Sequence, residues 1–304
     1  MRSFRPNLVV CRWLRWAVAT GGAFIPDIPV ILDLDIVDWR VHGSQEEQMS
    51  GRGLVKRIHS QFYTRTIEWN ARRRLRQFAH VWVVSEDDRQ IIGGRSCSVL
   101  PNVPILPASD GQRFASEKPN QPNILFVGDL GFSSNAHGLS RFLERVWPRL
   151  HEAAPELKLR IVGRLPDGES ASIARWRRVP NVELVGFVED LGVEYERALF
   201  TVAPIYWGGG TKIKVIESLG RGKTCVVTPH SLYGLGPHVR HGESLLCAPS
   251  DAEFADACLN LTRSEDLRQR LALKGRHTIH EYFSVARFND VVAETVQPFE
   301  LPRE

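Results

Sequence analysis

The sequence is poor in cysteine, and its few cysteines form no recognisable pattern. The 304-residue chain has five, and no two are spaced as C-x-x-C: Cys11, Cys97, Cys225, Cys247 and Cys258. An odd number of dispersed cysteines argues against both a disulfide framework and a zinc site. We therefore expect free, buried thiols in a reducing compartment.

The chain also lacks a strong excess of one charge. Its formal net charge is +4 and its pI about 8.9, which is too weakly basic to predict nucleic-acid binding and leaves an anionic small molecule as a candidate partner. Hydrophobic residues make up 43% and charged residues 24% of the chain. These proportions are typical of a globular protein that can bury a sizeable core.

No apolar run reaches the length of a membrane-spanning helix, which needs about 18 or more residues. Near the start of the chain, Arg12 and Arg15 interrupt the apolar character, which argues against a signal peptide. We therefore expect a cytoplasmic protein, with any membrane contact peripheral and at the inner face.

A proline-rich stretch divides the chain. Five prolines lie between Pro101 and Pro122, and proline disfavours both helices and inner strands. This stretch predicts a partial first domain over residues 1–105, a linker over 106–121, a second domain over 122–283, and a C-terminal helix and tail over 284–304.

Strand-like and helix-like segments alternate after this boundary. Short apolar runs predict buried strands at residues 124–127, 157–162, 182–185, 199–203 and 224–228, with helices between them at 139–151 and 212–219. Further helices are expected within 251–281 and near 285–295. Such alternation predicts a doubly wound α/β domain with a parallel sheet of five or six strands.

The most informative segment follows the fourth of these strands. Three glycines, Gly208, Gly209 and Gly210, precede a predicted helix for which Thr211 is a suitable N-cap. Glycines let the backbone approach a ligand closely, and the amides that begin a helix attract anions. Within that helix, Lys214 offers a positive charge for a diphosphate, and Glu217 offers a carboxylate for ribose hydroxyls. The same pattern also fits an ordinary Gly-rich turn followed by an ion pair between these two side chains, and the local sequence does not choose between them.

Several motifs in order resemble the donor half of retaining GT-B glycosyltransferases of the "glycosyl transferases group 1" type. The segment from Gly208 to Lys214, followed by Glu217, is the core of the resemblance. The other motifs are Phe126-Val-Gly-Asp-Leu130 with Asn135, Ile161-Val-Gly-Arg164, Val185-Gly-Phe-Val188 with Asp190, Thr224-Cys-Val-Val-Thr228 and Gly234-Leu-Gly236. The resemblance covers about residues 98–290 and implies an α/β, GT-B-like fold of two Rossmann-like domains.

The resemblance also implies roles for individual residues. Lys214 would contact the donor diphosphate, Glu217 would bind ribose, and both would be the catalytic residues. The remaining donor-site residues would be Gly128, Asn135, Arg164, Phe187, Gly208, Gly209, Gly210 and Thr211, with the backbone near Phe187 framing the base. The family often has a glutamate at the position of Gly209 and a basic residue where this chain has Ser133 and Ser134. The leaving diphosphate would then depend on Lys214, Arg164 and helix N-termini.

The implied activity is a retaining transfer of a sugar from a nucleoside diphosphate sugar to a hydroxyl acceptor, without metal or cofactor. The acceptor would be a glycan or a lipid-linked glycan, as in polysaccharide biosynthesis. Against the same family, the first domain lacks about its first third, since residues 5–10 resemble a middle strand. The alternative is therefore a non-catalytic, nucleotide-sugar-binding remnant. A Rossmann oxidoreductase is disfavoured because no G-x-G-x-x-G follows an early strand.

Two further clusters in the first domain have alternative interpretations. Asp33, Asp35 and Asp38 follow a strand and could hold a divalent metal, or form a polar strand end; we predict no metal site. The run Arg72-Arg-Arg-Leu-Arg76 ends a helix that also carries Ile67, Trp69, Leu75 and Phe78. It is either a solvated helix face or a surface for anionic lipid, and we expect at most weak, salt-sensitive lipid binding.

Overall fold

The computed structural model describes residues 6–19, 25, 27–37, 39, 41, 54–94, 96–106, 122–166, 168 and 171–299. The chain forms two compact units. The first comprises Met1–Asn102, Trp207–Thr211 and Ser284–Glu304, and the second comprises Val103–Tyr206 and Lys212–Phe283. Most of the expected linker, residues 107–121, lies outside the described residues.

The first unit is built on a parallel sheet of four strands in the order β1-β2-β3-β4. The strands are β1 (Val9–Arg12), β2 (Val30–Leu34), β3 (His80–Val83) and β4 (Cys97–Val99). The helices assigned to this unit are α1 (Leu14–Ala19), α3 (Leu54–Leu75), α4 (Glu86–Ile92), α12 (Val285–Val296) and the 3-10 turn η2 (Gln297–Phe299). The sequence analysis did not identify β4.

Alternating side chains cover the two faces of this sheet. Leu32 of β2 and Val83 of β3 point into a core with Ala71 and Leu75 of α3. On the other face, Ile31 and Trp82 pack with Leu100 and with Val291 of α12. The Trp82 indole also donates a hydrogen bond of 3.1 Å to the hydroxyl of Thr295. The C-terminal helix thus completes the core of the first unit.

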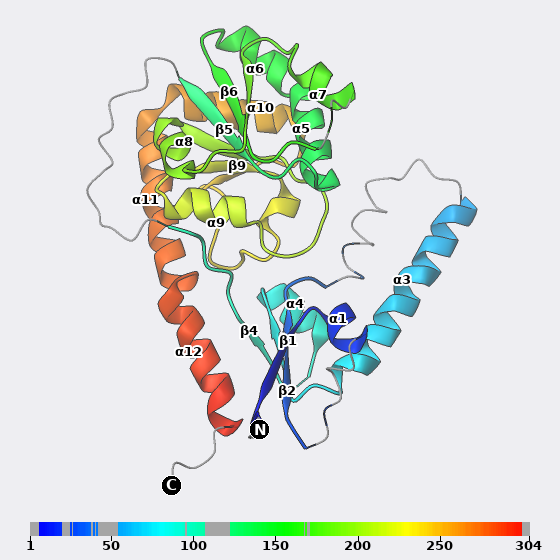
Figure 1. Ribbon diagram of the computed structural model, residues 1–304. Helices are drawn as coiled ribbons and strands as arrows, with labels where there is room; N and C mark the ends of the chain where they lie inside the picture. The colour runs from blue at the N-terminus through cyan, green and yellow to red at the C-terminus, as the bar shows by residue number, and fades with distance from the viewer. Residues whose placement is uncertain are drawn as a thin grey trace. The chain divides into compact units, whose positions relative to one another are not determined.

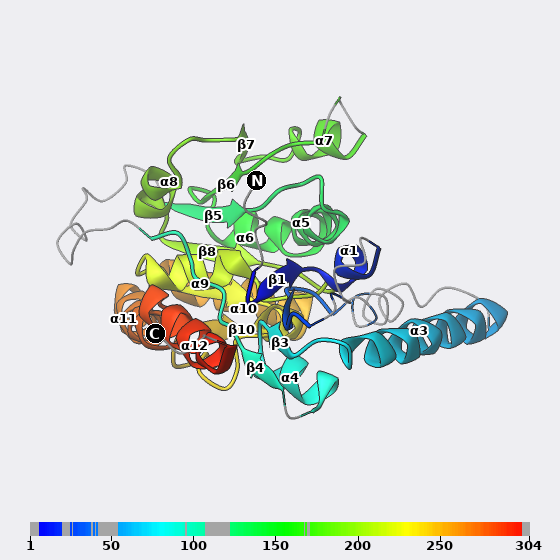
Figure 2. The same cartoon turned by 60° about the horizontal axis from the view of Figure 1, so that its bottom comes forward.

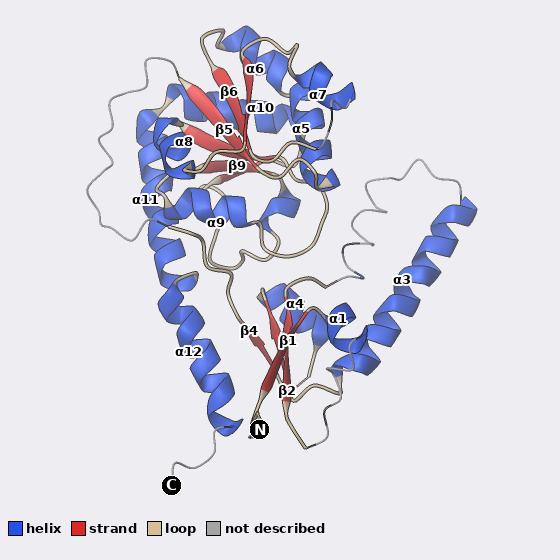
Figure 3. Cartoon of the chain, in the orientation of Figure 1, coloured by secondary structure: helices blue, strands red, loops and turns tan. Residues whose placement is uncertain are grey.

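The second unit is a parallel sheet of six strands in the order β10-β9-β8-β5-β6-β7. Figure 3 labels three of them, β5, β6 and β9, and shows helices packed around them. The strands are β5 (Asn123–Val127), β6 (Lys158–Val162), β7 (Val182–Gly186), β8 (Phe200–Ala203), β9 (Cys225–Val227) and β10 (Leu246–Cys247). The predicted parallel sheet of five or six strands is confirmed. The first five strands match the expected ranges within one residue, and β10 was not expected.

Helices cover both faces of this sheet, as a doubly wound domain requires (Figure 1). Side chains on one face form the largest core with α5 (Ser133–Arg145), α6 (Trp147–Ala153), α7 (Ala171–Trp176) and α10 (Asp251–Arg263). The other face packs against α8 (Leu191–Arg197), α9 (Ile213–Gly220) and α11 (Glu265–Tyr282). The short 3-10 turn η1 (Pro229–Leu232) follows β9.

One helix boundary differs from the expectation. A single helix was expected over residues 139–151, but the chain forms α5 and α6, which are separated at Val146. Pro148 lies in the first turn of α6, where its missing amide hydrogen has no helical partner to lose. In the interior of one continuous helix, the same proline would remove a hydrogen bond.

No helix in the described part of the chain combines the length and hydrophobicity needed to cross a membrane. The longest, α3, has 22 residues but a polar average character. All five cysteines are described, and all are free thiols.

Candidate functional site

The candidate site lies where parallel strands of the second unit end. Gly128 follows β5, Gly163 and Arg164 follow β6, and Phe187 follows β7. Because these strands run parallel, their carboxyl ends lie at the same edge of the sheet. Ligands of open α/β sheets bind outside this edge. The Gly-rich segment also leaves the carboxyl end of a strand, β8, as predicted.

Two glycines allow the loops after β5 and β6 to pack closely. Gly163 has a φ of +141°, and a Cβ atom built on it would lie 2.1 Å from the carbonyl oxygen of Gly128. A side chain at position 163 would therefore push the two loops apart. Glycine here fixes the position of Gly128 at the edge of the site.

Gly128 in turn leaves room for the ammonium group of Lys214. A Cβ atom built on Gly128 would lie 2.6 Å from Lys214 Nζ. That Nζ donates a hydrogen bond of 2.7 Å to Oδ1 of Asn135, and it lies 4.8 Å from the centre of the Phe126 ring. The Asn135 amide is itself oriented by donating to the Asp129 carbonyl at 2.8 Å. Three predicted site residues, Gly128, Asn135 and Lys214, are thus brought together.

The positive charge of Lys214 has no carboxylate beside it among the described residues. The residue as a whole is half-buried, but its ammonium group is enclosed by protein. Burial lowers the pKa of Lys214 to about 7, because loss of hydration disfavours the charged form. Among the described residues, no carboxylate lies within ion-pair distance of it. An enclosed amine with an amide partner and no carboxylate is suited to receive an anion.

Glu217 has partners other than Lys214. Its Oε1 lies 3.5 Å from Nη2 of Arg221, and its Oε2 accepts a hydrogen bond of 3.3 Å from the Tyr195 hydroxyl. Burial raises the pKa of Glu217, while Arg221 and Tyr195 oppose the rise. The ion pair between Lys214 and Glu217, one interpretation of the sequence, is not formed; Glu217 pairs instead at a spacing of four residues.

Arg221 holds this part of α9 against neighbouring segments. Its guanidinium donates to the Ile105 carbonyl at 3.0 Å and lies 5.2 Å from the centre of the Tyr195 ring. The sequence interpretation missed both Arg221 and Tyr195. Arg221 follows Glu217 by four residues, a spacing that places two helical side chains side by side, whereas no sequence pattern links Tyr195 to the pair.

The other predicted site residues are more exposed. Arg164 pairs with Asp129 at 3.4 Å, and its side chain is 73% exposed. Phe187 follows Gly186, whose φ is +84°, and is 76% exposed. Both residues could reach a ligand at the edge of the sheet, but neither is fixed by burial.

The Gly-rich segment has the expected backbone but a different N-cap. Gly208 and Gly210 have φ values of +118° and +66°, which favour glycine. Helix α9 begins at Ile213, with Lys212 at the N-cap position and no side-chain cap. The prediction of Thr211 as N-cap is wrong, because its hydroxyl donates to the Val84 carbonyl at 3.4 Å instead. Trp207–Thr211, including Gly209, are grouped with the first unit.

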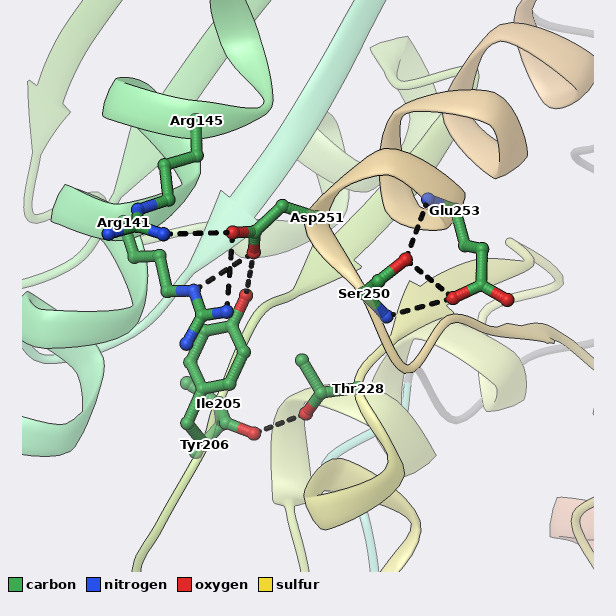
Figure 4. A network of polar contacts seen from close by, with 8 residues as sticks. All are labelled: Arg141, Arg145, Ile205, Tyr206, Thr228, Ser250, Asp251 and Glu253. Carbon is green, nitrogen blue, oxygen red and sulfur yellow. Dashed lines mark hydrogen bonds and ion pairs between the residues drawn. The ribbon is translucent and has the colours of Figure 1, made fainter. Parts of the chain in front are cut away.

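A polar network that the sequence analysis missed holds Tyr206, which lies three residues after the end of β8 (Figure 4). Arg141 of α5 makes two hydrogen bonds to Asp251 of α10, at 2.9 and 3.2 Å. Its guanidinium also lies 4.2 Å from the centre of the Tyr206 ring, and the Tyr206 hydroxyl donates to Asp251 at 3.3 Å. Burial raises the pKa of Tyr206 to about 12, so this hydroxyl keeps its proton.

Adjacent contacts in the same view continue this network. Arg145 adds a longer ion pair to Asp251 at 3.7 Å, and the Thr228 hydroxyl donates to the Ile205 carbonyl. Ser250 and Glu253 form a capping box at the start of α10 (Figure 4). Together these contacts connect β8, just before the Gly-rich segment, to α5 and α10.

An arginine pairs with two members of the acidic cluster of the first unit. Arg12 pairs with Asp33 at 3.4 Å and with Asp35 at 3.1 Å, while Asp38 lies outside the described residues. In the part of the chain that the structure describes, no group of three or more His, Cys, Asp or Glu side chains is placed to hold a metal ion.

One family model matches the second unit of the chain. Residues 121–264 match the model of the family described as "Glycosyl transferases group 1". An uncharacterized 44.6 kDa protein of the cps region of Klebsiella pneumoniae is 26% identical over 178 residues, which are 57% of this chain and 45% of that protein.

Solved structures share the fold at low sequence identity. HepE of Anabaena, in complex with UDP, has a TM-score of 0.71 and 16% identity, over 96% of this chain and 78% of its own. A TarM variant of S. aureus, in a complex that includes UDP, has a TM-score of 0.66 and 15% identity, over 91% of this chain and 52% of its own. The chain thus spans about half the length of TarM and of the Klebsiella protein. The match to the glycosyl transferases group 1 model is confined to residues 121–264, and the chain, with its two parallel α/β sheets, has a GT-B-like fold.

Proposed function

We propose that this protein transfers a sugar from a nucleoside diphosphate sugar to a hydroxyl acceptor, with retention of configuration and without a metal. The observation that carries the proposal is the enclosed ammonium group of Lys214, held by Asn135 beside Gly128 at the carboxyl edge of the sheet. A diphosphate placed there would supply the negative charge that the site lacks.

Each donor group has a counterpart among the described residues. Lys214 meets the diphosphate, Glu217 accepts hydrogen bonds from ribose hydroxyls, and the backbone near Phe187 frames the base. As the glycosidic bond breaks, negative charge grows on the leaving diphosphate. Lys214 and the amides at the start of α9 stabilise that charge, with Arg164 as a further cation, and fixed charges of this kind contribute much of enzymatic rate enhancement.

The similar proteins support the class of donor and the biological setting. HepE of Anabaena has been solved with UDP and with UDP-glucose, so a uridine nucleotide is the first donor to test. The cps region of the Klebsiella relative supports polysaccharide biosynthesis, and hence a glycan or a lipid-linked glycan as acceptor.

Titration calorimetry with UDP, GDP and ADP, with and without EDTA, tests the donor site. We expect at least one of these nucleotides to bind, and EDTA to leave its affinity unchanged. The proposed donor site is wrong if none binds to folded protein at millimolar concentration.

The variant Glu217→Gln is expected to weaken nucleotide binding about tenfold. The amide keeps the shape of the side chain and one acceptor oxygen but loses the charge that strengthens hydrogen bonds from ribose, a loss of about 1.5 kcal/mol. The corresponding 2′,3′-dideoxynucleotide, which lacks both hydroxyls, should bind the two proteins equally. An equal loss for both nucleotides would show that Glu217 acts through its contacts with Arg221 and Tyr195 rather than through ribose.

The affinity for nucleoside diphosphate is expected to fall as the pH rises above 7. Lys214 has a pKa of about 7 in the free protein, so below this pH the amine is already charged when the nucleotide arrives. Above it, binding must add a proton, and the affinity falls by up to about tenfold per pH unit. The terminal phosphate loses its last proton near pH 6, which is below this range. Calorimetry in buffers of different ionisation enthalpy measures the proton uptake directly.

Lys214→Arg is the matched control for this pH dependence, because arginine stays charged throughout the range. Its affinity should be flat where that of the native protein falls. A flat profile for the native protein, or the same slope in both, would contradict the role given to Lys214.

A nucleotide-sugar-binding protein without transferase activity is the second candidate. It is favoured by the smaller first sheet, which has four strands among the described residues against six in the second sheet. Intact nucleotide binding without detectable transfer or donor hydrolysis would support this candidate.

A further inference from the structure

Helix α3 of the first unit has apolar side chains on two opposite sides, and only one of these sides packs into the core of the unit. Ile67, Ala71 and Leu75 pack into the core beneath the four-stranded sheet. A second set of side chains forms what we call the exposed stripe: Ile58, Phe62, Arg65, Trp69 and Arg73. Their spacings of four, three, four and four residues place them along one side of the helix. That side is opposite the one that enters the core.

The large apolar side chains of the exposed stripe are mostly accessible to solvent. Ile58 is 58%, Phe62 is 72% and Trp69 is 61% exposed. In both views, the first half of α3 extends beyond the strands of its own unit (Figures 1 and 2). Large apolar side chains that are gathered on one exposed side of a helix indicate an interaction surface.

The positive charge around the exposed stripe favours an anionic partner. From Lys56 to Arg76 the chain has seven lysines and arginines and one acidic residue, Glu68. Glu68 is already paired with Arg72 at 2.8 Å. Within the exposed stripe, the guanidinium of Arg73 lies 5.8 Å from the centre of the Trp69 ring, so basic and aromatic groups form one surface.

A partner for the exposed stripe must bury its apolar side chains and place negative charge next to its arginines. The headgroup region of an anionic bilayer does both. We propose that α3 lies flat on an anionic lipid surface, with Ile58, Phe62 and Trp69 entering the interface and Arg65 and Arg73 meeting lipid phosphates. The exposed stripe is about 22 Å long and contacts the surface without crossing it. This docking is independent of the donor site and goes beyond the proposed transfer reaction.

The structure also divides the basic run that the sequence singled out. Arg74 lies about 160° around the helix from Ile58 and points away from the exposed stripe, whereas Arg73 lies within it. Of the apolar residues expected to accompany the run, Ile67, Leu75 and Phe78 belong to the core of the unit, and Trp69 alone is exposed. The lipid surface is therefore the exposed stripe rather than the four arginines together.

Vesicle sedimentation of the full chain tests the proposal. We expect binding to vesicles that contain phosphatidylglycerol, weaker binding at high salt, and little binding to pure phosphatidylcholine. The double variant Arg65→Gln/Arg73→Gln should lower the affinity about 25-fold, or about fivefold for each arginine near an anionic surface. Phe62→Ser/Trp69→Ser should also abolish sedimentation at high salt, where apolar insertion carries most of the binding.

Arg74→Gln is the matched control, because it removes one charge from the same helix on the opposite side and should change binding less than twofold. Circular dichroism and thermal melting show whether each variant stays folded, and all these positions are exposed. Equal binding to neutral vesicles would overturn the proposal, as would an Arg74→Gln effect as large as that of an arginine in the exposed stripe. Variants of the exposed stripe that bind vesicles as well as the native chain would also overturn it. The same holds if these variants abolish a self-association of the protein that lipid does not displace.

Discussion

Replacing Lys214 by alanine is expected to weaken UDP binding about 150-fold and to leave uridine binding nearly unchanged. The substitution removes both a charge and a donor from a site where the ammonium group is enclosed and no described carboxylate competes for it. Hydrogen bonds to charged groups contribute about 1.5–3 kcal/mol, and the enclosed position favours the upper end of this range. Calorimetry with UDP and uridine side by side measures the difference.

Two further variants separate charge from shape and from general effects. Lys214→Met keeps an unbranched chain beside Phe126 without the charge, so it should lose as much UDP affinity as the alanine variant. Lys274→Ala removes a lysine that is exposed on α11 in the same unit and should bind normally. If Lys214→Met retained native affinity, the side chain would act by packing, and the diphosphate site would be elsewhere.

Replacing Gly163 by alanine should destabilise the second unit by about 3 kcal/mol. The new Cβ would lie 2.1 Å from the Gly128 carbonyl oxygen, so backbone rather than a flexible side chain would have to move. Overpacking of this kind costs about 1–3 kcal/mol, and an L-residue at positive φ adds about 1–2 kcal/mol. Urea denaturation followed by circular dichroism gives the change. UDP affinity should fall as well, because Gly128 is displaced next to Lys214.

Gly242→Ala is the control for backbone strain alone. Gly242 also has a positive φ, +77°, but a Cβ built there meets no atom within 4 Å. Its cost should be about 1–2 kcal/mol, with unchanged UDP affinity. An equal loss of unfolding free energy at the two positions would contradict the close contact between Gly163 and the Gly128 carbonyl.

The second sheet was predictable because its inner strands are short apolar runs between polar segments. Residues 124–127 are entirely apolar, and residues 182–185 contain one polar residue among three apolar ones. Strands that are covered by helices on both faces have this composition. The strands that were missed lack this signal. β4 is Cys-Ser-Val, and β10 has two residues, so backbone pairing with a neighbouring strand defines them rather than their own side chains.

The candidate site was predictable in its residues but not in its contacts. Glycine, lysine and glutamate after a strand point to a phosphate and ribose site through their own chemistry. The neighbours of Lys214 and Glu217 depend on how distant segments pack. Asn135 and Phe126 reach Lys214 from about 80 residues earlier in the chain, and Tyr195 reaches Glu217 from helix α8. No local pattern contains this information.

The position of α12 has a consequence for how the protein folds during synthesis. Ile31, Trp82 and Leu100 bury one face of the first sheet against Val291, so nearly the whole chain must leave the ribosome before that face is covered. At about 5–20 residues per second, roughly 10–40 seconds separate the synthesis of Leu100 from that of Val291. All strands of the second unit, from β5 to β10, emerge within this interval. The sheet of the first unit is therefore synthesised before the second unit but completed after it, and in the meantime its uncovered apolar face can bind chaperones.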